Sequence, residues 1–362
     1  MNKISCLMAS VAVLATGLAM GEPLKPDRPR GIFVLSGLGG AQGGTEKSRQ
    51  IIGQVRNLDY VEGVTIGFSW ADTEPTPGQY DFSKVDAALA ALQTSGKKLN
   101  VEVFAVEVPE HVVARLPDAE IWESHAPGRR TVKTAVPWSQ TTLKAWRAYM
   151  KALADHPVSL PNGSKVRFSD HPALMMLDSP VVGLQGIRDL SKKLTALPGY
   201  DQKRFVDSVV ESVHATRDAF PSKFGFLGFF RMDDSKNSPP LEQEIMDRLM
   251  AEFNGPGQPS LGFFQETLSD SIPRADGLGK YLSDAKDRTY IVFQAKTAWS
   301  RPFTGAETVS SGKAAVGIQF AYETYKATYV EIYLPDALDP AQTASLRKWN
   351  DILMGRNVPE KR

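Results

Sequence analysis

Short apolar runs recur along the chain, at intervals that leave room for a helix between them. The runs are rich in β-branched and aromatic residues, which favour strands, and most are continuous rather than strictly alternating, which is typical of strands buried on both faces. Eight of them stand out: Gly31 to Ser36, Gly63 to Phe68, Leu99 to Phe104, Ala173 to Asp178, Phe224 to Phe230, Leu261 to Gln265, Tyr290 to Gln294, and Tyr329 to Tyr333.

Helical patterns fill the intervals between these runs. Val85, Leu89 and Leu92 fall on one stripe of a helix, as expected of a helix that buries one face. Eight strands alternating with helices predict an α/β fold, a single (β/α)8 barrel over residues 22–362, because each strand needs a crossover to reach a parallel neighbour. An open doubly wound sheet is the main alternative. It would carry a Gly-x-Gly-x-x-Gly loop after an early strand, and the glycines at 37, 39, 40, 43 and 44 do not fit that spacing.

One interval is unusually long. About 70 residues separate the third and fourth predicted strands, and prolines recur within them, whereas a βα unit typically takes about 30 residues. We expect this insertion after strand 3 to lie over the mouth of the barrel as a lid or as the wall of a subsite.

The N-terminal segment predicts export. Lys3 precedes a run of small and apolar residues, and Ala19-Met20-Gly21 offers a cleavage site before Glu22, so residues 1–21 are interpreted as a signal peptide of a secreted or periplasmic protein. The lone cysteine, Cys6, falls inside this segment, so the remaining chain has no disulfide framework. Residues 1–21 contain one lysine and no acidic residue, which leaves 41 basic against 41 acidic side chains. That balance argues against a nucleic-acid partner, and no segment is long and apolar enough for a membrane span.

Acidic residues near the ends of the predicted strands are the candidates for catalysis. Glu266 directly follows the sixth strand and Asp178 ends the fourth, where side chains of a barrel point to the mouth. Glu331 lies inside the eighth strand between two apolar residues, where it would be buried in the barrel. Each has an ordinary alternative: a solvated loop residue for Glu266, a turn cap for Asp178 and a structural salt bridge to an Arg or Lys for Glu331.

Aromatic and polar residues in the predicted loops suggest a carbohydrate ligand. Trp70, Asp72 and Glu74 follow the second strand within five residues, and rings beside carboxylates suit a polyhydroxylated ligand. Further candidates for substrate binding are Glu107, Trp138, Gln294 and Trp299. A tryptophan is often a core residue, so we expect at least one of Trp70, Trp138 and Trp299, and not necessarily all of them, to face the cleft.

Other chemistries find little support in the pattern. The five histidines are scattered without the spacing of a zinc site, and the acidic pair Asp233 and Asp234 lacks the surrounding loop of a calcium site. No Gly-x-Ser-x-Gly elbow is present. We therefore expect no metal and no cofactor.

The second strand and its loop carry a family resemblance. Trp70 to Pro75, followed by Gly78-Gln79-Tyr80-Asp81-Phe82, resembles the W…EP..G.YDF segment of glycoside-hydrolase barrels of the superfamily that includes the β-galactosidase, cellulase and xylanase families. The third strand ending in Glu107-Val108-Pro109-Glu110, Pro137-Trp138, and the final strand Tyr329 to Tyr333 are similar to segments of the same superfamily. The resemblance implies a (β/α)8 glycoside hydrolase that cleaves O-glycosidic bonds of an oligo- or polysaccharide.

The resemblance does not extend to the expected catalytic positions. In the superfamily an Asn-Glu pair at the end of strand four and a glutamate at the end of strand seven carry the reaction. Here strand four ends Leu177-Asp178-Ser179-Pro180 and strand seven ends Phe293-Gln294-Ala295-Lys296. The catalytic pair would therefore come from Glu266, Asp178 and Glu331. Two alternatives stay open: a barrel that binds glycans without cleaving them, suggested by Gln185 and Gln294, and a lyase or isomerase with Lys296 as base.

Overall fold

Eight parallel strands form a closed barrel, which confirms the predicted fold class and excludes the open doubly wound sheet. The computed structural model describes residues 28–36, 45–126, 130–187, 192–230, 239–255, 258–271, 279–302 and 310–356. The predicted signal peptide and the pair Asp233 and Asp234 lie outside them. Around the barrel the strands follow one another in chain order: β1 (Gly31–Leu35), β2 (Gly63–Ser69), β3 (Lys98–Phe104), β8 (Leu174–Asp178), β9 (Phe224–Gly228), β12 (Leu261–Leu268), β13 (Ile291–Ala295) and β14 (Tyr329–Ile332). β14 closes the barrel by pairing with β1.

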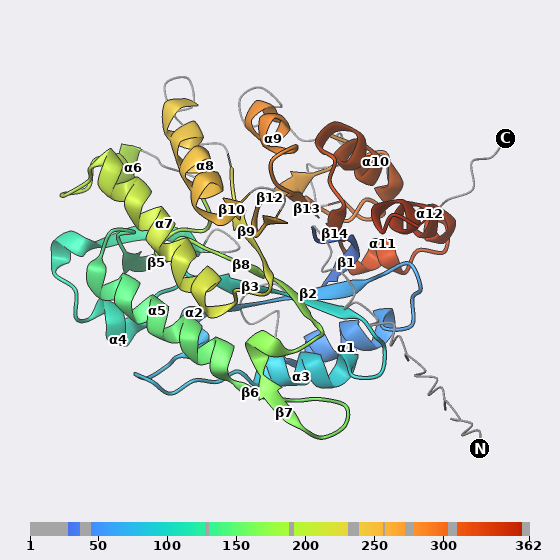
Figure 1. Cartoon of the computed structure of the whole chain (residues 1–362), viewed down its shortest axis with the longest axis horizontal. Helices are drawn as coiled ribbons and strands as arrows, with labels where there is room; N and C mark the ends of the chain where they lie inside the picture. The colour runs from blue at the N-terminus through green and yellow to red at the C-terminus, as the bar shows by residue number, and fades with distance from the viewer. Residues whose placement is uncertain are drawn as a thin grey trace, which may run out of the picture.

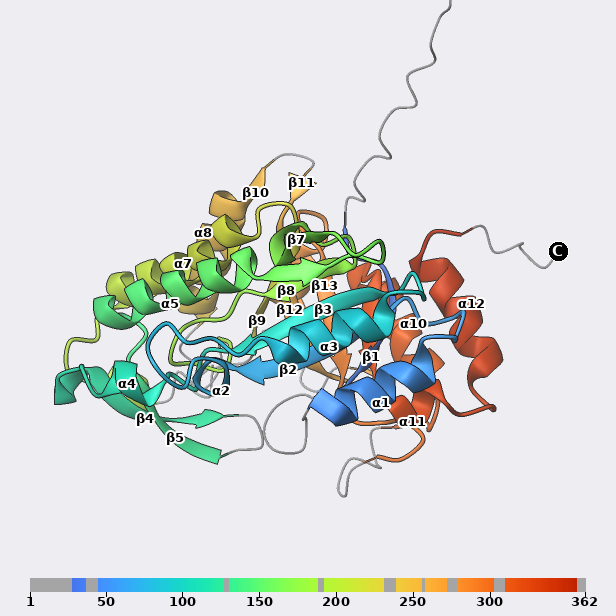
Figure 2. The same ribbon diagram turned by 90° about the horizontal axis from the view of Figure 1, so that it is seen from below.

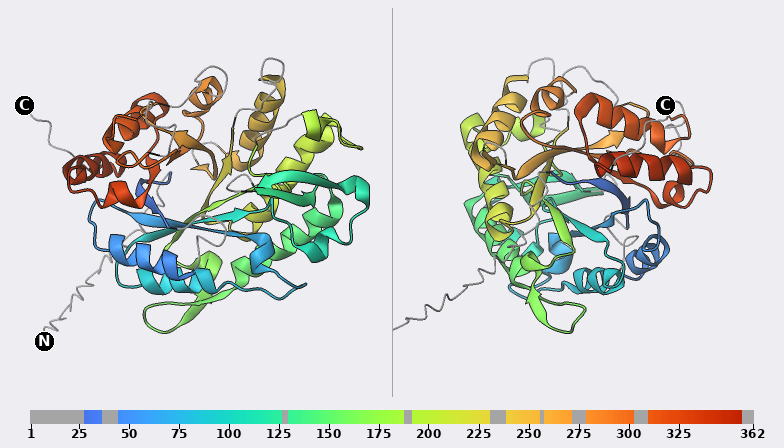
Figure 3. Two further views of the ribbon diagram at one scale, coloured as in Figure 1. Left: turned by 180° about the vertical axis from the view of Figure 1, so that it is seen from behind. Right: turned by 45° about the vertical axis from the view of Figure 1, so that its right-hand side comes forward.

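Helices surround the strands on the outside of the barrel (Figures 1 and 3). The longer ones are α1 (Thr45–Val55), α3 (Ser83–Leu92), α5 (Gln140–Asp155), α7 (Gln202–Ala219), α8 (Pro239–Phe253), α9 (Lys280–Ala285), α10 (Ala314–Tyr325) and α12 (Thr343–Leu353). The short ones are α2 (Trp70–Thr73), α4 (Glu110–Val113), α6 (Lys192–Thr195) and α11 (Leu334–Ala337). Among the described residues no helix is long and apolar enough to cross a membrane.

Polar residues at the helix starts explain several of these boundaries. The Ser139 hydroxyl accepts a hydrogen bond from the backbone N–H of Thr142 (3.4 Å) at the start of α5, and the Asp201 carboxylate accepts one from the backbone N–H of Arg204 (2.9 Å) at the start of α7. Such N-caps satisfy N–H groups that have no partner inside the helix. Each capped helix then buries one apolar face against the barrel.

The barrel has two separate layers of apolar packing. Outward-facing residues of the strands pack against the helices in one large core, while the interior of the barrel is filled by a second cluster that includes Phe33, Phe224, Tyr290 and Tyr329. Because side chains alternate along a strand, every second residue contributes to the interior. Toward the amino ends of the strands, aromatic rings therefore fill the interior of the barrel. Inward-facing polar side chains lie closer to the carboxyl ends.

The long connection between β3 and β8 contains more than one helix. It holds the hairpin β4 (Ile121–Ala126) and β5 (Arg130–Ala135) before α5, and the hairpin β6 (Pro157–Ser159) and β7 (Lys165–Arg167) after it. Figure 2 shows the β4–β5 hairpin next to α4. Its residues Ala126 and Val132 pack with Phe104 and Val106, at the carboxyl end of β3. That the connection serves as a lid or subsite wall stays a prediction.

Candidate active site

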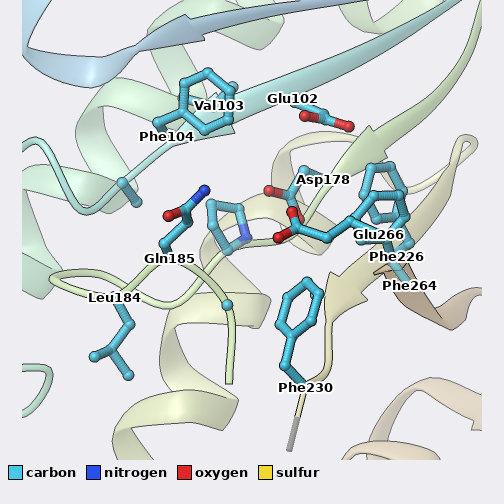
Figure 4. Close-up of a pocket in the computed structure, with 14 residues that line it drawn as sticks. Glu102, Val103, Phe104, Asp178, Leu184, Gln185, Phe226, Phe230, Phe264 and Glu266 are labelled. Carbon is cyan, nitrogen blue, oxygen red and sulfur yellow. The ribbon is translucent and has the colours of Figure 1, made fainter. Parts of the chain in front are cut away.

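The carboxyl ends of the barrel strands enclose a cavity with three acidic side chains in its wall. Glu102 comes from β3, Asp178 from β8 and Glu266 from β12. In Figure 4 the carboxyl groups of Asp178 and Glu266 point toward each other, with Glu102 above them and the amide of Gln185 facing them across the cavity. The cavity volume is about 40 Å³, more than the roughly 10–15 Å³ that one water molecule needs. Water therefore has room beside the carboxyl groups.

Strand alternation places Glu102 in this cavity. Leu99, Val101 and Val103 of β3 belong to the outer core, so Asn100 and Glu102 between them face the interior. Glu102 is 6 % exposed and lies one inward position above Asn100. On β2 its register partner is Gly67, which has no side chain to compete for the space.

A register shift in β12 helps to aim Glu266. The pairing of β12 with β13 is regular up to Gln265 and shifts before Leu268. The Gln265 side-chain oxygen stabilises this irregular turn of the strand by accepting hydrogen bonds from the N–H (2.8 Å) and the hydroxyl (2.7 Å) of Thr267. Bulges of this kind commonly re-aim a side chain next to an active site. The local sequence Gln-Glu-Thr thus contributes to the position of the carboxylate.

Phenylalanine rings form the apolar part of the wall. Phe226, Phe230 and Phe264 line the cavity together with the carboxylates, and Phe230 lies below them in Figure 4. The apolar C–H face of a sugar ring packs well against an aromatic ring while its hydroxyls bind polar groups. The combination of rings and carboxylates therefore suits a carbohydrate.

Glu331 lies beneath the cavity and not in its wall. The side chain is fully buried inside the barrel, and its Oε1 atom accepts hydrogen bonds from the Thr65 hydroxyl (2.6 Å), the Asn100 amide (2.8 Å) and the Tyr329 hydroxyl (2.6 Å). Burial raises the pKa of Glu331, and these three hydrogen bonds oppose that shift. The alternative of a salt bridge to an Arg or Lys is wrong, because the three partners are neutral.

Tyr333 connects this buried layer with the site electrostatically. It follows β14 two residues after Glu331, which is an inward position. Burial, followed by the negative charges of Glu266, Glu102 and Glu331, raises the pKa of Tyr333 to about 12. The phenol consequently keeps its proton at neutral pH and can donate a hydrogen bond.

The loop after β2 is held together by its own residues. Trp70 is 0 % exposed, packs against Trp146 and Tyr149, and donates from its Nε1 to the Glu74 carboxylate (2.7 Å). Asp72 is exposed in the first turn of α2. The structure therefore places Trp70 and Glu74 in the core beside α5, away from the cavity, because the rings of Trp146 and Tyr149 cover the apolar part of the indole while Glu74 accepts from its N–H.

The other predicted binding residues also lie outside the cavity wall. Trp138 is 2 % exposed and contacts Tyr200, and Trp299 is 2 % exposed with its Nε1 donating to Asp270 (3.2 Å). All three candidate tryptophans are thus packed in the core, contrary to the expectation that at least one faces the cleft.

Three further polar residues complete the comparison with the sequence. Glu107 pairs with Arg130 of the β4–β5 hairpin (2.5 Å), which ties the hairpin to the loop after β3. Gln294 is 7 % exposed at an inward position of β13, in register with Glu331. Lys296 is half-buried after β13 and does not line the cavity.

Glu102 is the functional candidate that the sequence analysis did not find. It lies in the run Leu-Asn-Val-Glu-Val-Phe, where polar residues alternate with apolar ones. In a barrel such alternation marks inward polar positions, so a strict period-2 reading of this strand could have identified it. Among the described residues no group of three or more His, Cys, Asp or Glu side chains is arranged to hold a metal ion.

Comparison with known proteins agrees with this architecture. The family model described as beta-galactosidase (Glyco_hydro_42) matches residues 42–178, which is less than half of the chain. The chain has a closed (β/α)8 barrel, and part of it is similar to this glycoside-hydrolase family. The family model and the barrel together confirm the resemblance to the glycoside-hydrolase superfamily. No curated protein sequence matches the chain.

Solved structures share the fold at low sequence identity. The catalytic domain of β-amylase from Paenibacillus polymyxa aligns with a TM-score of 0.56 and 11 % identity, covering 91 % of this chain and 99 % of that one. β-Galactosidase from the psychrophilic Marinomonas ef1 gives 0.54 and 12 %, covering 90 % and 61 %. GH5_18 from Streptomyces cattleya in complex with GlcNAc gives 0.52 and 12 %, covering 91 % and 82 %. At these identities the likeness shows the fold alone.

Proposed function

We propose that this glycosidase-type barrel hydrolyses O-glycosidic bonds with Asp178 and Glu266 as its carboxyl pair. The observation that carries the proposal is the meeting of these two side chains in one cavity at the carboxyl ends of the strands. Active sites of (β/α)8 enzymes are built at this end of the barrel, and glycoside hydrolysis generally needs two carboxyl groups that flank the scissile bond. A family model for β-galactosidases matching residues 42–178 supports the same chemistry.

The two groups divide the reaction between them. One carboxyl group protonates the leaving glycosidic oxygen, while the other carboxylate either attacks the anomeric carbon or removes a proton from the attacking water. The cavity has room for such a water, and Phe230 offers an apolar face for the sugar ring. Gln185 and Glu102 are placed to bind hydroxyl groups next to the reacting carbon.

The test is hydrolysis of a panel of 4-nitrophenyl glycosides and unlabelled oligosaccharides by the wild-type chain and single variants. Asp178→Asn and Glu266→Gln should each reduce kcat/KM by at least about 100-fold, since each removes a proton-transfer or nucleophilic group. The matched control is Asp72→Asn, which changes an exposed carboxylate of α2 and should leave the rate unchanged.

Two results would contradict the proposal. Cleavage that persists in both site variants would place the chemistry elsewhere. Calorimetric binding of an oligosaccharide without any release of reducing ends over several days would instead identify a glycan-binding barrel.

Export is a separate proposal that rests on the N-terminal sequence pattern. Lys3, the small and apolar run after it and Ala19-Met20-Gly21 are typical of a cleaved signal peptide. Edman sequencing of the protein recovered from a bacterial periplasm should begin at Glu22. A chain that stays in the cytosol and begins at Met1 would refute this.

A further inference from the structure

A second hollow lies at the opposite end of the barrel from the carboxylates. It has a volume of about 340 Å³ and is lined in part by the first residues of three strands, Lys98 of β3, Leu174 of β8 and Phe224 of β9. The residues of the active-site cavity come from the carboxyl ends of the same strands. The two sites are thus separated by the aromatic plug inside the barrel, and a volume of this size is in the range of small-molecule pockets.

The floor of this hollow is apolar. Leu174, Met175, Phe224 and Met354 line it, and Met175 and Met354 are only partly buried. Methionine side chains adapt to irregular apolar ligands better than branched ones do. The floor therefore suits an unbranched hydrocarbon chain.

Two ammonium groups converge on one part of the rim. The Lys223 Nζ donates to the carbonyl of His171 (2.9 Å), and the Lys98 Nζ donates to the carbonyl of the next residue, Pro172 (3.1 Å). Both ammonium groups also act on the His171 ring. Burial makes the largest contribution to lowering the pKa of this ring, and the positive charges of Lys223 and Lys98 lower it further. Like charges held this close create a positive field that an anion would relieve.

Two further cations of the lining strengthen that field. Arg28 and Arg30 add two more cations to it. Glu62 is the one acidic residue among the described residues that line the hollow, and its carboxylate is engaged by Arg356 and by the Asn350 amide (2.7 Å). Two carboxylates outside the lining pair mainly with other cations, Asp170 with Arg167 and Asp287 with Lys326, although the charges of Lys223 and Arg28 contribute in turn to lowering the pKa of Asp170 and of Asp287.

We propose that this hollow binds a single-chain amphipathic anion, a carboxylate such as a medium-chain fatty acid. The headgroup lies between Lys98 and Lys223, and the hydrocarbon chain lies along Met175 and Phe224. The site is a hollow, and the large apolar residues exposed on the described surface, Val316, Tyr322 and Leu338, do not line it. A free ligand therefore fits the site better than the surface of a lipid bilayer does.

The experiment is isothermal titration of the purified chain with dodecanoate below its critical micelle concentration. We expect saturable binding that weakens as salt is added. The double variant Lys98→Gln/Lys223→Gln should bind at least about tenfold more weakly, because two charge-assisted hydrogen bonds are lost. The matched control is Lys286→Gln, in which the altered ammonium also donates to a backbone carbonyl, that of Thr324 (2.9 Å), but outside the hollow.

A second variant, altered in the apolar floor of the hollow, tests the proposal even if the double variant does not fold. Met175→Glu puts a negative charge on the half-exposed floor and should abolish binding while the thermal unfolding midpoint stays close to that of the wild type. Four results would overturn the proposal: no binding of dodecanoate, equal binding by the double variant, equal binding of dodecyltrimethylammonium, or co-sedimentation with phosphatidylglycerol vesicles without binding of free dodecanoate.

Discussion

Replacing Glu331 tests how the barrel interior tolerates a buried carboxyl group. In Glu331→Ala the three donors that now reach Oε1, from Thr65, Asn100 and Tyr329, lose their acceptor. At about 1 kcal/mol for each hydrogen bond, we expect a loss of about 3 kcal/mol in the free energy of unfolding. The cavity left by the side chain adds to this loss.

Glu331→Gln separates the charge from the hydrogen bonds. The amide oxygen can still accept from the three donors, while the amide nitrogen takes the place of Oε2, a buried atom that has no hydrogen-bond partner in the structure. An unsatisfied buried donor costs about 1–3 kcal/mol. At about pH 4 the wild-type carboxyl is protonated and has one such donor, its O–H, whereas the amide has two N–H groups, so the variant should be less stable by the cost of one further donor.

The difference between wild type and Glu331→Gln should shrink as the pH rises. Burial raises the pKa of Glu331 in the folded chain above the value of about 4.3 of an unfolded glutamate. The stability associated with this group is thus fully present below about pH 4.3 and is lost as the pH rises through the folded pKa. Glutamine does not titrate, so the variant lacks this loss.

Urea unfolding at a series of pH values between about 4 and 8 measures both effects, with the free energy of unfolding extrapolated to water. A constant difference between wild type and Glu331→Gln over this range would show that Glu331 does not titrate as argued. A cost below about 1 kcal/mol for Glu331→Ala would show that its three hydrogen bonds do not stabilise the barrel.

Two further predictions concern a buried lysine and a glycine with positive φ. Burial lowers the pKa of Lys84, which donates to the Gly67 carbonyl (2.6 Å), to about 8, so its isotope-labelled dimethylated form should titrate near that value by NMR; a midpoint above 10 would contradict this. Gly183 has φ +77° and a Cβ there would lie 2.0 Å from the Ala135 carbonyl oxygen, whereas Gly163 has φ +83° with open space around it. Gly183→Ala should therefore cost clearly more than the roughly 1–2 kcal/mol expected of Gly163→Ala, and equal costs in urea unfolding would refute the steric argument.

The strands could be predicted because buried parallel strands leave a strong signal. Each of the eight apolar runs became a barrel strand, and bounds shifted by only a few residues, as for Leu261 to Gln265, which extends to Leu268 in β12. Asp178 and Glu266 were identified because a polar residue directly after an apolar run lies at the mouth of a barrel. Both indeed line the cavity.

The aromatic residues could not be assigned in the same way. Trp70 directly follows β2, as a ligand-binding residue would, but its indole packs on Trp146, more than 70 positions away in α5. The pattern of one segment does not show which distant helix will cover it. The apolar wall of the cavity instead comes from phenylalanines of β9 and β12, whose inward positions depend on the register of the closed barrel.

The order of the strands explains how the two carboxylates can meet although only Asp178, on strand four, lies on a strand expected from the family resemblance, while Glu266 lies on strand six. β3, β8, β9 and β12 are consecutive neighbours, so Asp178 and Glu266 are two strands apart, roughly 9–10 Å at the backbone. On β9, between these two strands, Gly228 lines the cavity, and a Cβ there would lie 3.0 Å from the Phe230 ring. On the far side of Asp178, the register partner of Glu102 is Gly67, which has no side chain. Gln294 faces inward on β13, the seventh strand, without lining the cavity. Among the described residues the only carboxylates that line the cavity are Glu102, Asp178 and Glu266, so the cavity takes its acidic groups from strands three, four and six and none from strand seven.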